Sequence, residues 1–265
     1  MTSPLCLAEA ACAVLNAPAP TEKIALSHRF AAAWREGAIH EIGAAQPPDR
    51  PARPARPALH DPRDMPRRRG AGSLANRIAL LHAVAHIELN AIDLAWDLIA
   101  RFAALDLPRD FFDDWVAVAD QEATHHALVA GRLTALGASY GDLPAHDGLW
   151  QAAQATAHDL LARLAVVPLV LEARGLDVTP AMIAKLRRQG DEASVAALEI
   201  IYAEEIGHVA AGQRWFQWEC ARRGNDPVIS YRDLVRRYHG GALKPPFNRA
   251  ARDAAGFAAA FYESV

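Results

Sequence analysis

The apolar residues of this chain recur at helical spacing along most of its length. Almost no stretch alternates between apolar and polar residues in the way that a half-buried strand does. Hydrophobic residues make up 52% of the chain, and Ala and Leu, both good helix formers, dominate them. The pattern therefore predicts an all-α fold. We expect helices over about 4–16, 21–37, 73–105, 110–136, 149 to just past Glu172, 180–189, 191–223 and 231–239, and a last helix from Arg249 or Asp253.

Punctuating residues set the expected helix ends. Ser73 is placed to cap the helix that follows it, and Gly137 and Gly224 stand where two later helices should end. Pro168 should kink its helix one turn before Glu172, because proline lacks the backbone N–H that the helix needs. The run 175–180, which begins with Gly and ends with Pro, predicts an interruption of the same helix.

The composition divides the chain into four segments. Two short helices fill an N-terminal segment, residues 1–45, and prolines and arginines then dominate residues 46–72. So many prolines exclude a regular helix, and we expect an extended, mostly solvated strap there. Residues 73–225 should form a four-helix bundle, with 137–148 as a crossover connection, and 226–265 should form a helical tail that packs on the bundle.

Each bundle helix carries an acidic residue within its apolar stripe. Glu88 lies among apolar residues on the first helix, and Glu122 with His125 does so on the second. Glu172 follows a buried-type stretch of the third helix, and the fourth carries its own acidic residue and histidine. A buried glutamate is costly unless something compensates its charge, so these positions indicate a binding site rather than ordinary core.

The motif Glu-x-x-His occurs twice, at Glu122 with His125 and at Glu205 with His208. Residues three apart on a helix lie on one face, so a single metal ion can contact both side chains. Together with the lone glutamates the chain order is Glu, Glu-x-x-His, Glu, Glu-x-x-His, the ligand pattern of bundles that hold two metal ions. One such motif arises easily by chance and would then be a surface pair, whereas two on apolar faces in this order are much harder to obtain.

The ligand types point to iron or manganese. Carboxylates with imidazoles suit these ions, and no cysteine stands at the motifs to indicate a thiolate zinc site. Glu204 lies four residues before His208 and competes with Glu205 as a ligand, although the three-residue spacing favours Glu205. Two roles fit the three aspartates Asp93, Asp97 and Asp120. They either accept hydrogen bonds from ligand histidines or lie on a solvated helix face.

Beyond the spacing, the amino-acid sequence around the motifs resembles the ferritin-like di-iron carboxylate superfamily, and most of all a bacterial ferritin-like family of unknown function. The resemblance covers nearly the whole chain except the strap. It implies two iron ions, or manganese in their place. The segments that carry it are His86-Ile87-Glu88, Glu122 to His125, Glu172 to Asp177, Glu205 to His208 and Leu243 to Asn248, and the ligands it implies are Glu88, Glu122, His125, Glu172, Glu205 and His208.

Three functions are compatible with such a site. The first is an oxygen-activating oxidase or hydroxylase, whose partners would be dioxygen, an unidentified substrate and an electron donor, with Pro245 to Asn248 as a lid. The second is a non-catalytic metal-binding or iron-handling protein. The third, by analogy with a tRNA hydroxylase that has similar ligands, is RNA modification, which needs a basic surface that Pro66 to Arg69 could join.

Charge and cysteine content narrow the setting. The net charge of −3 gives no reason to expect a protein that coats nucleic acid. The three cysteines lack paired spacing, which favours a reducing compartment, and no uncharged apolar run reaches the roughly 20 residues of a membrane span. We therefore expect a soluble cytoplasmic protein without a membrane partner, with a homodimer as a further option.

Overall fold

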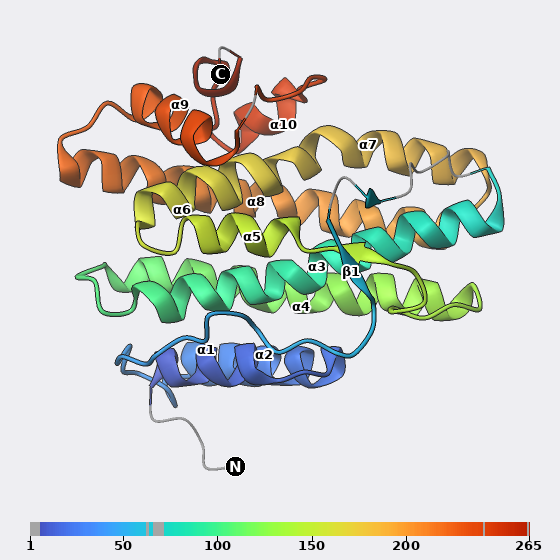
Figure 1. Ribbon diagram of the computed structural model, residues 1–265, viewed down its shortest axis with the longest axis horizontal. Helices are drawn as coiled ribbons and strands as arrows, with labels where there is room; N and C mark the ends of the chain where they lie inside the picture. Colours follow the sequence, from blue (N-terminus) through green and yellow to red (C-terminus); the bar gives the residue numbers. More distant parts are fainter. Residues whose placement is uncertain (1–5, 62–63, 66–71, 241, 264) are drawn as a thin grey trace. The chain divides into compact units, whose positions relative to one another are not determined.

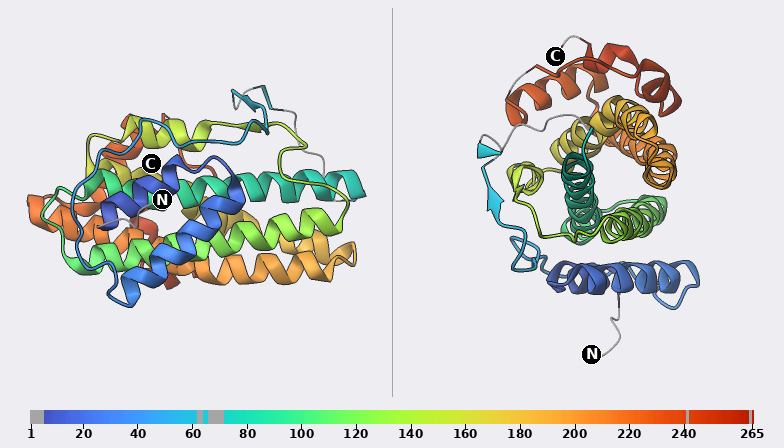
Figure 2. Two further views of the ribbon diagram at one scale, coloured as in Figure 1. Left: turned by 90° about the horizontal axis from the view of Figure 1, so that it is seen from below. Right: turned by 90° about the vertical axis from the view of Figure 1, so that its right-hand side faces the viewer.

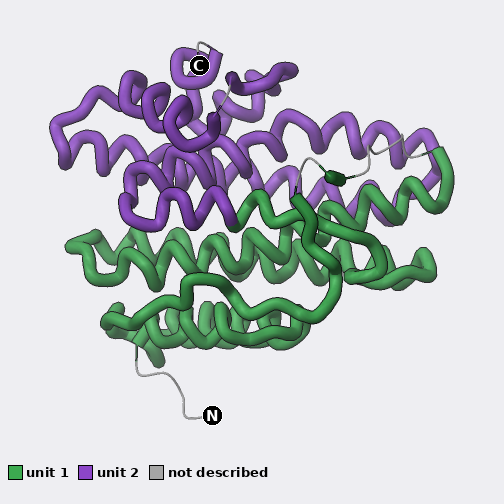
Figure 3. Tube along the Cα trace, in the orientation of Figure 1, with its two compact units in different colours: residues 1–150 green, residues 151–265 purple. Residues whose placement is uncertain are grey.

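The computed structural model describes residues 6–61, 64–65, 72–240, 242–263 and 265. Helices dominate these residues, and the only strands described are two of two residues each, so the predicted all-α class is confirmed (Figure 1). The chain divides into two compact units, residues 1–150 and 151–265 (Figure 3). Each unit contains a pair of long helical segments and short helices that pack on that pair.

The first unit is built on the helices α3 (Leu74–Phe102) and α4 (Arg109–Ala135). The shorter helices α1 (Leu7–Asn16) and α2 (Pro20–Arg35) lie as a layer on one side of this pair, with α1 against α3 and α2 against α4 (Figure 2). Ser73 caps α3 as predicted, because its side chain accepts a hydrogen bond from the Asn76 N–H. The predicted ends of all four helices hold to within a few residues.

Helix α3 is the core helix of its unit. By length and composition alone it could cross a membrane, which the sequence reading did not anticipate, but 72% of its most apolar window is buried inside the protein. The buried part includes Asp93 and Asp97 as well as Glu88. Burial of this extent is what the core helix of a soluble protein shows.

The Pro-rich strap is extended as predicted, but it is anchored rather than merely solvated. Its residues Leu59 and His60 form the strand β1, which pairs in parallel with β2, Ala145 and His146, in the crossover connection. Arg53 reaches Asp93 on α3 at 3.0 Å. The run Pro66 to Arg69 lies outside the described residues.

The second unit is built on two long helical segments. One consists of α6 (Leu160–Val166), the π-helical segment η2 (Val167–Glu172) and α7 (Ala173–Arg188), and the other is α8 (Glu192–Arg223), which ends at Gly224 in the left-handed conformation. The helix α5 (Gly148–Ala155) spans the boundary of the units. The turn between α5 and α6, which Asp159 closes by capping α6, was not predicted.

The predicted interruption at 175–180 is wrong. Helix α7 runs through Pro180 without a break. Proline at this position removes the hydrogen bond to the carbonyl of Leu176, four residues earlier. The side chain of Asn248 supplies a donor to that carbonyl instead, at 3.1 Å, so a residue far along the chain stabilises what the local sequence alone would have broken.

The tail covers α7 and α8. Helix α9 (Pro227–Tyr238) packs on α6 and α8, and α10 (Arg249–Ala254) packs on α7 and α8, while α11 (Ala259–Tyr262) follows close to α9 (Figure 2). The buried Arg252 joins the tail to α7 through Asp177, with an ion pair of 2.7 Å. Three aromatic rings surround the Arg252 guanidinium, those of Phe247, Phe257 and Tyr262. Within this unit the tail contacts α6, α7 and α8, and its packing on a four-helix bundle stays a prediction.

Candidate metal centre

The first unit brings three of the predicted ligands together. Glu88 on α3 and Glu122 and His125 on α4 are all buried, and one candidate ligand atom from each lies within 4.8 Å of the others. The Nδ1 atom of His125 is 3.5 Å from a carboxylate oxygen of Glu88 and 3.4 Å from one of Glu122. We call these three residues the buried triad.

The spacing within the buried triad fits a shared ion. A strong hydrogen bond between these groups would be shorter than about 3.2 Å. Ligand atoms about 2.1 Å from one metal ion lie roughly 3.0–3.4 Å from each other, close to the separations seen here. The triad therefore has the residue types, the burial and the convergence that a metal ion requires.

Burial and mutual proximity shift the proton affinities of the triad. Burial raises the pKa of Glu88 to about 8, against the hydrogen bond from His125, and the nearby charge of Glu122 adds to the increase. Burial disfavours the charged form of His125, but contacts with Glu122 and Glu88 outweigh it and raise the pKa of the imidazole. Without a metal ion, protons bound to Glu88 and His125 therefore supply the positive charge that the buried carboxylates need.

The second unit carries the other predicted ligands. Glu205 and His208 lie one turn apart on α8, with 3.7 Å between a Glu205 oxygen and the His208 Nδ1 atom. The Glu205 side chain is 12% exposed and that of His208 is buried, as expected for a pair that faces a protein interior. Glu172 is half-buried at the end of η2. The choice of Glu205 over Glu204 as a ligand stays a prediction.

The three aspartates singled out in the sequence have other partners. Asp93 accepts from the buried Lys23 at 2.7 Å, and Asp97 pairs with Arg101 at 2.7 Å. Asp120 pairs with Arg35 at 3.1 Å and with His28. The structure thus corrects both suggestions for Asp93 and Asp97, which hold basic side chains within the first unit rather than a ligand histidine or a solvated face.

Three histidines near the triad, His82, His86 and His126, form a separate cluster around Tyr140. His86 donates through Nε2 to the carbonyl of His146, so its Nδ1 accepts from the Tyr140 hydroxyl, each at 2.8 Å. Burial lowers the pKa values of His86 and His126 to about 4, so both are neutral. His126 bonds to the backbone of α3. These histidines are not among the predicted ligands, and no sequence pattern indicated Tyr140 as their common partner.

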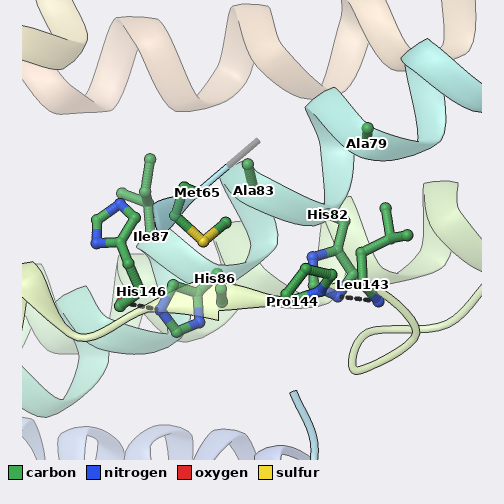
Figure 4. Close-up of a pocket in the computed structure, with 10 residues that line it drawn as sticks. Met65, Ala79, His82, Ala83, His86, Ile87, Leu143, Pro144 and His146 are labelled. Carbon is green, nitrogen blue, oxygen red and sulfur yellow. Dashed lines mark hydrogen bonds between the residues drawn. The ribbon is translucent and has the colours of Figure 1, made fainter. Parts of the chain in front are cut away.

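A pocket of about 140 Å³ lies beside this cluster, on the face of α3 that carries His82 and His86 (Figure 4). Apolar side chains make up most of its wall. Nε2 of His82 accepts from the Gly141 N–H at 2.9 Å, and both ring nitrogens of His86 are in hydrogen bonds. These nitrogens are occupied and do not offer a metal site. Figure 4 shows the sulfur of Met65 and the ring of Pro144 at the same pocket.

Two further residues of α8, Tyr202 and Gln213, lie on either side of Glu205 and His208 in the sequence. Tyr202 lies one turn before Glu205, and its hydroxyl accepts from the Asn248 amide at 2.8 Å, so the tail fixes this ring. Gln213, five residues after His208, is buried, and none of the described residues offers its side-chain amide a hydrogen-bond partner. The sequence gave no signal for Gln213.

Comparisons with known proteins place the chain in a family. The family model described as "Protein of unknown function (DUF455)" matches residues 16–263. The chain belongs to the DUF455 family. A protein of Haemophilus influenzae is 44% identical over 201 residues, which are 74% of this chain and 69% of that protein, and it is described as an uncharacterized protein. No solved structure matches the chain.

Membership of DUF455 covers both units and both Glu-x-x-His motifs. It agrees with the expected bacterial family of unknown function, and it assigns no reaction. The functional argument therefore rests on the side chains themselves, first of all on the buried triad.

Proposed function

We propose that this DUF455 protein holds two iron or manganese ions and oxidises an organic substrate with dioxygen. The observation that carries the proposal is the buried triad, with two carboxylates and an imidazole converging in a protein interior. Such a group is costly to bury without a cation. A metal ion supplies the missing charge.

The full ligand set is proposed from the repeated pattern. Each unit has one Glu-x-x-His motif and one lone glutamate, and in each motif the carboxylate lies within 3.7 Å of its histidine. Two divalent cations balance the charge of four carboxylates, whereas one leaves two charges uncompensated. The proposed ligands are Glu88, Glu122, His125, Glu172, Glu205 and His208, the last three from the second unit.

The residues of the chain would bind the ions, hold them in place and limit access of water. Two ferrous ions, when bound, supply the two electrons with which dioxygen is activated. The apolar residues Leu89 and Ile92 on α3 and Val129 on α4, close in sequence to the triad, are fully buried, so this part of the unit excludes bulk water. A low local polarity strengthens the interaction between the carboxylates and the ions.

The ferritin-like arrangement and the cellular location belong to the same proposal. A ferritin-like bundle would use α3, α4, the α6 to α7 segment and α8 as its four helices. The described cysteines, Cys6, Cys12 and Cys220, are all free thiols, which supports a reducing compartment such as the cytoplasm.

The decisive experiment measures bound metal and oxygen consumption together. Protein purified without chelator is analysed for metal content and then loaded anaerobically with ferrous iron. We expect about two ions per chain, and oxygen uptake with a reductant that falls to background in a Glu122→Ala, Glu205→Ala variant. Less than one ion per chain after loading would refute the metal centre. Two ions without reductant-driven oxygen turnover would instead support the iron-handling alternative.

A further inference from the structure

The backbone that presents Glu172 departs from the regular helix. Residues 167–172 form the π-helical segment η2, in which an extra residue is accommodated between α6 and α7. Pro168, the second residue of this segment, has no backbone N–H to donate to the preceding turn. Such a segment turns the residues that follow it about the helix axis, so it decides where Glu172 points. A π-helical turn is less favourable than an α-helical one unless other contacts hold it.

One contact that holds η2 comes from Gly212 on α8. A Cβ atom built at Gly212 would lie 2.7 Å from Cγ of Pro168 and closer still to its Cβ. Real Cβ atoms do not come that close to another carbon, so any larger residue at 212 must push η2 and α8 apart. Gly212 lies one turn beyond His208, and therefore sets the distance between the helix with Glu205 and His208 and the segment with Glu172.

A second contact comes from Tyr231 on α9. The Ala173 N–H bonds to the carbonyls of Pro168 and Val170, which leaves the carbonyl of Leu169 without the usual helical donor. The hydroxyl of Tyr231 donates to that carbonyl at 3.1 Å. Tyr231 is fully buried, and burial raises the pKa of its phenol, so the hydroxyl keeps its proton. The tail thus supplies the hydrogen bond that the π-turn gives up.

We propose that Gly212 and Tyr231 are positioning residues that hold η2 in its π-helical form and thereby set the place of Glu172 relative to Glu205 and His208. The assignment rests on the proposed metal function for its consequence, but not for the contacts themselves. Neither residue is a ligand. Both hold the η2 segment in place. A displacement of that segment by less than about 1 Å would move the Glu172 carboxylate enough to weaken binding of a metal ion.

The test compares Gly212→Ala with Gly131→Ala. Gly131 lies near the C-terminal end of α4, and a Cβ atom added there meets no atom within 4 Å, so this variant controls for the helix propensity of Ala. Tyr231→Phe is matched by Tyr238→Phe, which removes a hydroxyl that bonds to the exposed His158. Circular dichroism first confirms that each variant is folded.

Two readouts separate this proposal from the metal proposal. Equilibrium dialysis against Mn²⁺ should show that Gly212→Ala weakens binding of one of the two ions by about tenfold or more, as loss of supporting contacts does in metal sites. Tyr231→Phe should have a smaller effect in the same direction. Hydrogen exchange in metal-free protein should show faster exchange at residues 169–173 in both variants and in neither control.

The outcomes are distinguishable. Unchanged exchange at 169–173 in Gly212→Ala would overturn the positioning role whether or not metal binds. Faster exchange with unchanged Mn²⁺ affinity would show that η2 is held by these residues without influence on a ligand, which also overturns the role. Wild-type protein that binds neither Mn²⁺ nor ferrous iron would refute the metal proposal, and the exchange result alone would then decide whether Gly212 and Tyr231 hold η2.

Discussion

The Asn248 side-chain amide donates to the backbone carbonyl of Leu176 at 3.1 Å, the very carbonyl that Pro180 cannot serve. The same amide also donates to Tyr202. The Asn248 side chain therefore replaces a missing backbone hydrogen bond of α7. It also fixes the ring of Tyr202, one turn from the proposed ligand Glu205.

Replacing Asn248 with Ser should destabilise the protein by about 1–2 kcal/mol, because a buried carbonyl loses its donor while the capping role of residue 248 is retained. The cost should be smaller in a Pro180→Ala background, where residue 180 regains an N–H for Leu176. Urea unfolding of the two single variants and the double variant measures the difference. Equal costs in both backgrounds would contradict the repair.

The metal-free protein should lose stability as pH rises. Glu88 and His125 both have pKa values raised by folding, Glu88 from 4.5 to about 8, so the folded state binds more protons than the unfolded state over that range. Stability is then fully present below the unfolded pKa values and falls as pH increases through 5 to 8. Thermal melts of chelator-treated protein at pH 6 and pH 8 check the sign.

Metal should reverse this trend. Binding releases the protons of the triad, so affinity for the ion increases with pH over the same range. The melting temperature of loaded protein at pH 8 should exceed that of metal-free protein by more than it does at pH 6. A Glu88→Gln variant, which cannot ionise at this position, should lose the Glu88 share of the pH dependence of the metal-free form and keep the share of His125.

Gln213 should be replaceable at a gain in stability. Its side-chain amide is buried without a hydrogen-bond partner among the described residues, and an amide in that state costs about 1–3 kcal/mol. Gln213→Met keeps the shape and removes the polar atoms, so the free energy of unfolding should rise by about 1 kcal/mol or more. Gln217→Met, on the exposed side of α8, is the control and should change little. A loss of stability in Gln213→Met would reveal a partner for the amide.

The ion pair of Lys23 with Asp93 should be one of the most sensitive points of the first unit. Both side chains are fully buried, at 2.7 Å, and Lys23 also donates to the carbonyl of Val14. Asp93→Ala leaves a buried cation and should cost about 3–5 kcal/mol. Asp233→Ala breaks an exposed pair and should cost under about 1 kcal/mol, which denaturant unfolding can separate.

The helices and the candidate ligands could be predicted from the sequence because helical periodicity is local. Ser73 capped α3 as expected, and Glu122 with His125 face inward because their neighbours on the same stripe are apolar. The π-turn at Pro168 was anticipated only as a kink. The pattern around a single proline does not reveal whether the chain bends, breaks or takes up an extra residue.

The failures have a common physical origin in contacts between distant parts of the chain. Helix α7 continues through Pro180 because of Asn248, and Asp93 is not a hydrogen-bond acceptor for a ligand because Lys23 takes it. Each partner lies about 70 residues away in sequence. Helical periodicity predicts that a polar group is buried, but it does not predict which charged group or hydrogen-bond donor from a distant part of the chain will pair with it.

The anchored strap makes the N-terminal segment part of what α3 needs in order to fold. Lys23 and Arg53 neutralise Asp93, and the backbone carbonyl of Pro48 receives Arg101, the partner of Asp97. A shortened protein that begins at Ser73 would keep all four long helices, yet it would leave the buried Asp93 of α3 without its cations Lys23 and Arg53. A form of this protein in which Asp93 stays paired therefore includes both α2 and the Pro-rich strap.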